Sequence, residues 1–286
     1  MPDVIDPARA GATGRNGTGN GGLVGNGGGG GTGGGVRLSD AVAAEWVKLR
    51  SLRSTWTLLT LGAVLTVLVS LAFCALIGPE FRRADPAQRA ALDPVGLTFT
   101  GVQFGQVPVV ILAVLSVGGE YGTGMIRTSL AAVPRRGMLL AAKLTVLGTT
   151  GLLWGLLTGA VTLTVGSTAL GAPVPLHAAA LRALVGAGLY AGLLAVLAAA
   201  LTFAVRRSLT ALGILLPLLF VVSGALAATP RLRPLARLLP DRAGLRLMQA
   251  HQDTGDLSPT AGGTVLLLWA LLAAAGSYAA LRRQEC

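Results

Sequence analysis

The chain has 286 residues, of which 52% are hydrophobic and only 12% are charged, and its formal net charge at pH 7 is +11. This composition lies outside the range of ordinary soluble domains and inside that of proteins with several membrane-spanning helices. Basic residues beside apolar spans usually contact anionic headgroups or set orientation, so we expect membrane lipids as partners and no nucleic acid.

The N-terminal stretch, residues 1–36, is polar and lacks the charged start, apolar core and cleavage site of a secretory signal. From Gly11 to Gly35 it is mostly Gly with Asn and Thr, which buries too little apolar surface to offset the entropy lost on folding. The glycine run at 27–31 has neither a preceding strand nor the Gly-Lys-Ser/Thr ending of a phosphate loop. We predict a disordered cytoplasmic tail at 1–36 and one membrane domain at 37–286.

A helix is predicted to begin at Ser39 and Asp40, whose side chains can cap free backbone amides. Apolar residues from Val42 to Trp56 follow at helical spacing, which favours a helix lying in the headgroup region. The polar residues of this segment lie off the apolar stripe, except one arginine that must extend its side chain outward. A plain N-terminal extension of the first span fits the pattern equally well. The residues assigned to the interfacial helix are Glu45, Trp46, Lys48, Arg50 and Arg53.

Six stretches are long and apolar enough to cross a hydrocarbon core, which takes roughly 20 residues per helix. The predicted fold is therefore all-α, a polytopic membrane protein with six transmembrane helices. The predicted spans are residues 56–78, 95–117, 139–167, 179–204, 209–228 and 262–281.

Basic residues near the span ends predict the orientation. With six spans, one side receives Lys48, Arg50, Arg53, Arg127, Arg135, Arg136, Lys143, Arg206, Arg207, Arg282 and Arg283. This side is expected to be the cytoplasm, so both termini lie inside a multi-pass protein of the inner (plasma) membrane. The opposite side also receives arginines, which weakens the prediction without reversing it; these are Arg82, Arg83, Arg89, Arg231, Arg233, Arg237, Arg242 and Arg246.

The segment between the second and third spans combines an acid, glycines and arginines between two apolar runs. Glu120 and Tyr121 are expected to end the second helix, and Gly122 and Gly124 permit the chain to reverse. One or two helical turns are expected at 125–132, before a proline. The arginines expected to face water, headgroups or a protein partner are Arg127, Arg135 and Arg136. Basic residues alone indicate an orientation anchor, whereas the acid, the glycines and the short helix together favour a docking segment.

No ionisable group lies near the middle of any predicted span, where a charge is costly and marks an ion or proton pathway. Lys143 and Arg182 lie near span ends, so they are expected to extend their charged groups toward water. A carrier driven by ions would need buried acids or an interrupted ion site. Helix breaks at Pro108 and Pro217 leave that class open but less favoured.

Catalytic and metal-binding patterns are missing from the spans. His177 and His251 fall in predicted outer loops, and Cys74 and Cys286 lie on separate elements without metal-ligand spacing. No nucleophile motif occurs within a span. We expect no catalytic, cofactor-binding or metal site in this chain.

Small residues recur at four-residue spacing in the third and fourth spans. In lipid such stripes let helix backbones approach closely, so we predict packing seams; a dimer interface or the lining of a conduit is the alternative. The stripes are Gly151, Gly155 and Gly159, and Ala187, Ala191 and Ala195.

The segment from Pro230 to Thr260 alternates leucines with arginines. Pro234 and Pro240 limit each helical piece to about one or two turns. Short surface or re-entrant helices fit this pattern, and so does a solvated charged loop whose leucines rest on lipid.

The chain resembles the permease subunits of type 2 ATP-binding-cassette (ABC) exporters, especially those of high-GC actinobacteria. The resemblance runs from about Ala43 to the C-terminus. It rests on segment 45–55, on Glu120-Tyr121-Gly122-Thr123-Gly124, and on Arg127, Pro134-Arg135-Arg136 and Lys143. It implies an interfacial first helix, six spans, a cytoplasmic coupling helix between spans two and three, and outer re-entrant helices before span six.

The resemblance also implies a function. Loop 119–137 would dock into a separate cytoplasmic ABC ATPase subunit, which binds ATP and Mg, while this chain forms the substrate path with a second copy or a paralogue. The coupling residues implied are Glu120, Tyr121, Gly122, Thr123, Arg127, Pro134, Arg135 and Arg136. The alternatives are a non-transporting sensor or immunity module that recruits a cytoplasmic partner, and an ion-coupled secondary transporter.

Overall fold

The structure, a computed structural model, describes residues 37–125, 136–171, 178–249 and 257–283, all within the unit Val36–Cys286. The predicted tail at 1–36 lies outside these residues. The described residues contain helices and no strands, which confirms the all-α class. The helices are α1 (Leu38–Ser51), α2 (Arg53–Arg83), α3 (Pro86–Ala91), α4 (Pro94–Thr98), α5 (Val102–Gly122), α7 (Arg136–Leu170), α8 (Ala178–Val205), α9 (Ser208–Pro217), the π-helix η1 (Leu218–Val222), α10 (Ser223–Ala228), α11 (Arg233–Ala236), α12 (Pro240–Leu245), the 3₁₀ helix η2 (Arg246–Met248) and α13 (Pro259–Arg282).

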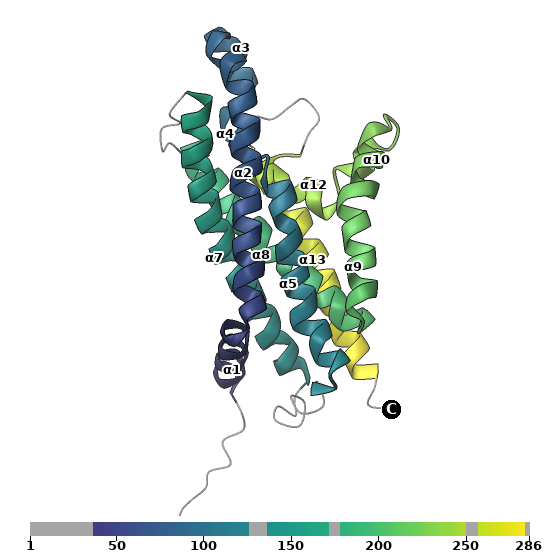
Figure 1. The fold of residues 1–286 in the computed structure, drawn as a ribbon. Helices are drawn as coiled ribbons and strands as arrows, with labels where there is room; N and C mark the ends of the chain where they lie inside the picture. The colour runs from purple at the N-terminus through teal and green to yellow at the C-terminus, as the bar shows by residue number, and fades with distance from the viewer. Residues whose placement is uncertain (1–36, 126–135, 172–177, 250–256, 284–286) are drawn as a thin grey trace, which may run out of the picture. The chain divides into compact units, whose positions relative to one another are not determined.

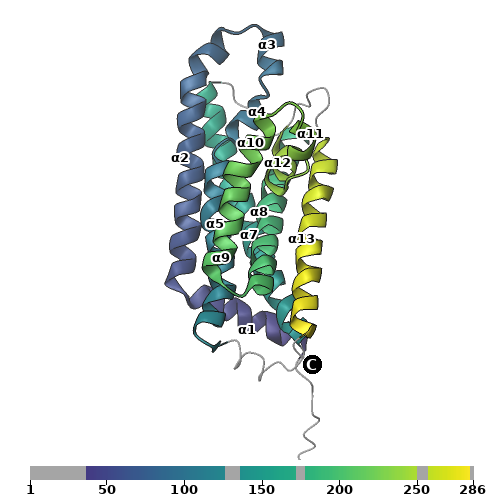
Figure 2. The ribbon, with the colours of Figure 1, turned by 90° about the vertical axis from the view of Figure 1, so that its right-hand side faces the viewer.

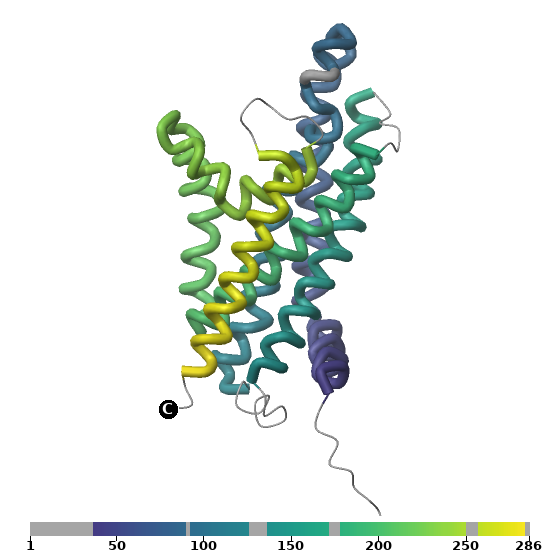
Figure 3. Tube along the Cα trace, turned by 180° about the vertical axis from the view of Figure 1, so that it is seen from behind, coloured from purple at the N-terminus to yellow at the C-terminus, as the bar shows by residue number. Residues whose placement is uncertain are grey.

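Six helical stretches of the described chain are long and apolar enough to cross a membrane, as predicted: α2, α5, α7, α8, the continuous stretch 208–228, and α13. Both α1 and the last described turn of α13 lie at one end of the helix bundle, and α3 lies at the other (Figure 1). We call these the α1 end and the α3 end. Figure 3 shows α13 crossing the bundle obliquely between the two ends.

The predicted start of the second span at residue 95 is wrong. Asp93 caps the separate short helix α4, because its Oδ1 accepts a hydrogen bond from the Gly96 amide at 3.0 Å. The span itself begins at Val102, after Gly101 has packed against α2 with its amide 2.9 Å from Ser70 Oγ. A Cβ on Gly101 would lie 2.0 Å from the carbonyl oxygen of Thr66. The span ends at Gly122, five residues beyond its predicted end at 117.

Helix α1 is separate from the first span, so the alternative of a plain extension is wrong. It ends at Ser51, Leu52 has an extended backbone (φ −81°, ψ 122°), and α2 begins at Arg53. The indole of Trp56 donates a hydrogen bond to the Arg50 carbonyl at 3.1 Å, which satisfies one free carbonyl at the end of α1. Figure 2 shows α1 lying across the direction of the spans.

The segment before the last span forms the short helices α11, α12 and η2. Gly244 of α12 lies so close to the Tyr190 ring of α8 that a Cβ would come within 2.3 Å of it, and a Cβ on Gly262 of α13 would lie 2.3 Å from the Ala243 carbonyl. Helix α12 is thus packed onto α8 and α13. This packing agrees with the short-helix interpretation and contradicts a solvated loop over these residues.

Candidate functional site

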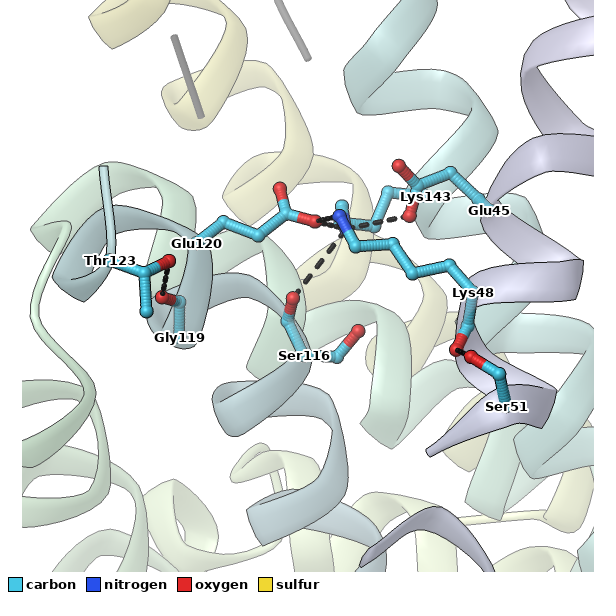
Figure 4. A network of polar contacts seen from close by, with 8 residues as sticks. All are labelled: Glu45, Lys48, Ser51, Ser116, Gly119, Glu120, Thr123 and Lys143. Atoms are coloured by element: carbon cyan, nitrogen blue, oxygen red, sulfur yellow. Dashed lines mark hydrogen bonds and ion pairs between the residues drawn. The ribbon is translucent and has the colours of Figure 1, made fainter. Parts of the chain in front are cut away.

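Four charged side chains from three helices meet at the α1 end (Figure 4). Lys143 Nζ of α7 lies 2.7 Å from Glu45 Oε2 of α1 and 2.7 Å from Glu120 Oε1 of α5. Lys48 of α1 also pairs with Glu120 Oε1. We call Glu45, Lys48, Glu120 and Lys143 the ion cluster. It joins the helix before and the helix after the segment 126–135 to α1.

The fold places α1 so that one of its faces is covered. Ala41, Glu45 and Leu49 are buried at a spacing of four residues, which brings them to one side of an α-helix. Ala41 packs with Leu139 and Ala142 of α7. The apolar contacts on either side of Glu45 thus hold its carboxylate against Lys143.

Three of the four members of the ion cluster, Glu45, Glu120 and Lys143, are buried, and Lys48 is partly exposed. Lys143 is 1% exposed and Glu120 is 4% exposed, whereas the Lys48 side chain is 33% exposed. The two carboxylates and two ammonium groups have no net formal charge. Buried charges are tolerated where opposite charges compensate them. Each buried member of the ion cluster therefore depends on the others for its compensating charge. Glu120 Oε2 is buried without a hydrogen-bond partner among the described residues.

Three placements expected from the sequence are therefore wrong. Lys143 does not extend toward water, because two carboxylates hold its ammonium group inside the bundle. Glu120, which the resemblance placed in the docking loop 119–137, lies in the last turn of α5, where it was expected to end the helix, but its side chain is buried. Glu45 lies on the buried face of α1, although it falls off the apolar stripe of that helix.

The other residues of the predicted coupling segment have mixed surroundings. The half-buried Tyr121 packs edge-on against Phe203, with ring centroids 6.2 Å apart. Gly122 and Thr123 are exposed, and Gly124 has φ +72°, a left-handed backbone conformation that glycine adopts readily. Arg136 begins α7 and donates a hydrogen bond to the Leu281 carbonyl of α13 at 3.2 Å. Arg127, Pro134 and Arg135 lie outside the described residues.

The other residues predicted for the interfacial helix are exposed, and the two small-residue stripes lie at a helix contact. Trp46 is 41% exposed, and Arg50 and Arg53 are exposed. A Cβ on Gly155 would lie 2.5 Å from the Ala187 carbonyl, and one on Gly151 would lie 2.7 Å from the Ala191 carbonyl. The two stripes therefore face each other at the contact of α7 with α8. Gly159 approaches Ala187 there, and Ala195 is buried on α8.

A second polar cluster, near the α3 end, was not predicted from the sequence. Ser223 of α10 donates a hydrogen bond to Asp241 Oδ2 of α12 and accepts one from Arg242 Nε at 3.1 Å. Asp241 is fully buried, and burial raises the pKa of its carboxyl above the usual value of 3.8, although the Ser223 hydrogen bond partly opposes that rise. The sequence offered one signal, an acid directly after a proline in an otherwise basic segment.

Metal binding finds no support in the part of the chain that the structure describes, since it holds no group of three His, Cys, Asp or Glu side chains placed to bind a metal ion. His177, His251 and Cys286 lie outside that part. Cys74 is buried within α2, where its thiol faces the Leu97 carbonyl at 3.7 Å.

The six apolar helices define a multi-pass α-helical membrane protein. Among known protein families, the ABC-2 family transporter protein matches residues 41–226, about two thirds of the chain. The chain therefore belongs to the ABC-2 family and is a transmembrane permease of an ABC transporter. Such a permease is a membrane component that is not catalytic by itself. The matched region contains the whole ion cluster. No curated protein matches the chain.

Proposed function

We propose that this chain is the permease subunit of an ATP-driven exporter, which forms the substrate path and receives movement from a separate cytoplasmic ABC ATPase through residues 119–137. The observation that carries the proposal is the ion cluster. It ties the end of α5 and the start of α7, which flank that segment, to each other and to α1. A displacement of the segment would thus move three helices together.

The contacts of the flanking helices support transmission to the other spans. Gly118 of α5 touches α9 so closely that a Cβ would lie 2.0 Å from Ser208 Oγ. Arg136 ties the start of α7 to the Leu281 carbonyl of α13. Close-packed interfaces of this kind pass displacement on because they do not deform continuously. Movement received at the α1 end would therefore reach α9 and α13 as well as α8, which packs along α7.

The proposal gives the predicted coupling residues different tasks. Glu120 is buried and already paired, so its task is to position α5 against α7 and α1. Contact with the ATPase falls to exposed residues, of which Thr123 is one. The proposal places the α1 end and both termini in the cytoplasm. It also places ATP and Mg in the ATPase, and it requires a second permease copy or a paralogue.

Cysteine cross-linking tests the docking part of the proposal. The chain with Cys286→Ser keeps only the buried Cys74, so Thr123→Cys supplies one accessible thiol at the α1 end. The matched control is Gln88→Cys, an exposed residue of α3 at the other end. With the ABC ATPase that co-purifies with the tagged chain, a short reagent that joins a thiol to an amine is expected to cross-link the ATPase to Thr123→Cys only.

Two results would refute the proposal. One is equal cross-linking of the ATPase to both positions, or to Gln88→Cys alone. The other is labelling of Thr123→Cys by a membrane-impermeant maleimide added to intact cells, because the α1 end would then face the exterior.

A further inference from the structure

A groove follows the outer surface of α8, beginning near the α3 end. It consists of two hollows that share Leu189 in their walls. The first has a volume of about 470 Å³ and lies between the α8 residues 178–189, Leu247 of η2 and Pro259 of α13. The second has a volume of about 350 Å³ and lies between residues 144–152 of α7 and residues 189–196 of α8.

The length of the first hollow matches one leaflet. Eleven residue steps from Ala178 to Leu189 rise roughly 16 Å at 1.5 Å per residue, and half of a hydrocarbon core is about 15 Å. The second hollow continues the groove along α8 past the bilayer centre. An extended chain that enters at the α3 end therefore remains in contact with α8 through its own leaflet.

The groove wall is apolar, because its hydroxyl groups are occupied locally. Thr145 Oγ1 lies 2.8 Å from the Ala141 carbonyl, and Thr149 Oγ1 lies 2.8 Å from the Thr145 carbonyl. Thr260 at the α3 end shares a hydrogen bond with Ser258. With these hydroxyl groups already hydrogen-bonded within the chain, the wall suits an acyl chain and offers little to a polar ligand.

One cation stands at the mouth of the groove. Arg182 lines the first hollow and is exposed, and its guanidinium donates a hydrogen bond to the Gln249 carbonyl at 3.1 Å. Arg182 forms no ion pair with a described residue. A guanidinium has five N–H donors in a planar fork that matches phosphate oxygens. The anchored arginine therefore presents further donors beside the apolar hollow.

We propose that this groove is a binding site for one phospholipid, whose phosphate contacts Arg182 and whose acyl chain lies along α8. The cation at the mouth and the apolar hollow of leaflet length together fit that amphiphile. A second copy of the chain fits less well, because a two-fold interface centred on this groove would bring two Arg182 side chains together. The site lies on the outer surface of the bundle and is separate from the ion cluster and from ATPase docking.

Native mass spectrometry of the detergent-purified full chain, titrated with phosphatidylglycerol, tests this site. Arg182→Gln removes the charge, and Val185→Trp fills the hollow at a position that is 48% exposed. Each variant is expected to weaken lipid binding about tenfold, the effect of losing one charge-assisted contact or its equivalent in apolar contact. The matched controls keep the wild-type affinity: Arg83→Gln, an exposed arginine at the same end, and Leu157→Trp, a 71% exposed residue outside the groove.

Three outcomes would overturn the assignment. Groove variants that bind lipid as well as the controls would show that the bound lipid is unspecific. Displacement of the lipid by millimolar inorganic phosphate would show that the arginine recognises phosphate without the chain. In the Cys286→Ser background, a disulfide between two Val185→Cys copies in membranes would show that a second copy covers the groove.

Discussion

Replacing Lys143 with methionine isolates the role of the ion cluster, because it removes the ammonium group and keeps a long unbranched side chain. The ammonium lies 2.7 Å from one oxygen each of Glu45 and Glu120, and Lys143 is 1% exposed. In the variant Glu120 keeps its contact with Lys48. Glu45 loses the one cation with which it pairs among the described residues.

The expected magnitude follows from these distances and exposures. At 2.7 Å and an effective dielectric constant of about 20, each contact has a Coulomb energy of about 6 kcal/mol, much of which the desolvation of the ions offsets. Removing one partner of a buried pair lowers the free energy of unfolding by about 3–5 kcal/mol. The matched variant Lys48→Met, whose wild-type side chain is a third exposed, is expected to lower it by about 1 kcal/mol.

Thermal unfolding in detergent measures the difference. One kcal/mol shifts the midpoint by roughly 2–4 °C in a chain of this size, so Lys143→Met is expected to unfold roughly 6–20 °C lower and Lys48→Met only a few degrees lower. The double variant Lys143→Met with Glu45→Leu removes the uncompensated acid, and it is expected to recover at least half of the loss.

A local measurement shows whether α1 detaches. Ala41 is 4% exposed against α7, so a thiol in Ala41→Cys is expected to react with maleimide slowly in the wild-type background and quickly beside Lys143→Met. The reasoning is refuted if Lys143→Met unfolds no lower than Lys48→Met, or if Glu45→Leu adds to the loss.

Two further predictions concern packing and pH. Gly155→Ala is expected to lower the free energy of unfolding by about 1–3 kcal/mol, because its Cβ would lie 2.5 Å from the Ala187 carbonyl; Gly213→Ala, whose Cβ meets nothing within 4 Å, is expected to raise it by about 0.5–1 kcal/mol. Equal effects in thermal unfolding would contradict this. Burial raises the pKa of Asp241, so the protonated carboxyl stabilises the folded state. This contribution to the free energy of unfolding is complete below pH 3.8, the usual pKa, and is lost as the pH rises through the raised pKa. The unfolding temperature of Asp241→Asn is expected not to show this decrease with pH. Ser223→Ala removes a hydrogen bond that lowers the pKa of Asp241, so in this variant the decrease is expected to extend to higher pH. Identical pH profiles for the wild type and Asp241→Asn would contradict this assignment.

The sequence predicted the six spans because the length and apolarity of a span are local properties. It misplaced the second span because the deciding contact is tertiary: nothing near Gly101 in sequence shows that its backbone packs on α2. Proximity to the following polar loop also made Glu120 look exposed. The helix ends at Gly122, one residue after the expected end at Tyr121, and the side chain of Glu120 is buried.

The members of the ion cluster were all noted in the sequence, yet their pairing was not. Lys143 and Glu45 are 98 residues apart, and Lys48 and Glu120 are 72 apart. Periodicity describes one helix at a time and does not show which face of α1 meets α7. A lysine near a span end was therefore expected to extend toward water. Two opposite charges on neighbouring helices, which are known only from the fold, reverse that expectation.

Because Glu120 is buried, ATPase binding and the transmission of movement can belong to different residues, although the sequence assigned both to one loop. If exposed residues such as Thr123 bind the ATPase while the ion cluster transmits its movement, Lys143→Met should leave the affinity for the ATPase nearly unchanged and still reduce transport per ATP hydrolysed. Thr123 variants should change that affinity and leave the unfolding temperature unchanged. If both variants instead lowered affinity in parallel, the ion cluster would only be shaping the docking surface. Measuring affinity and transport on the same preparations therefore distinguishes transmission of movement from simple placement of the loop.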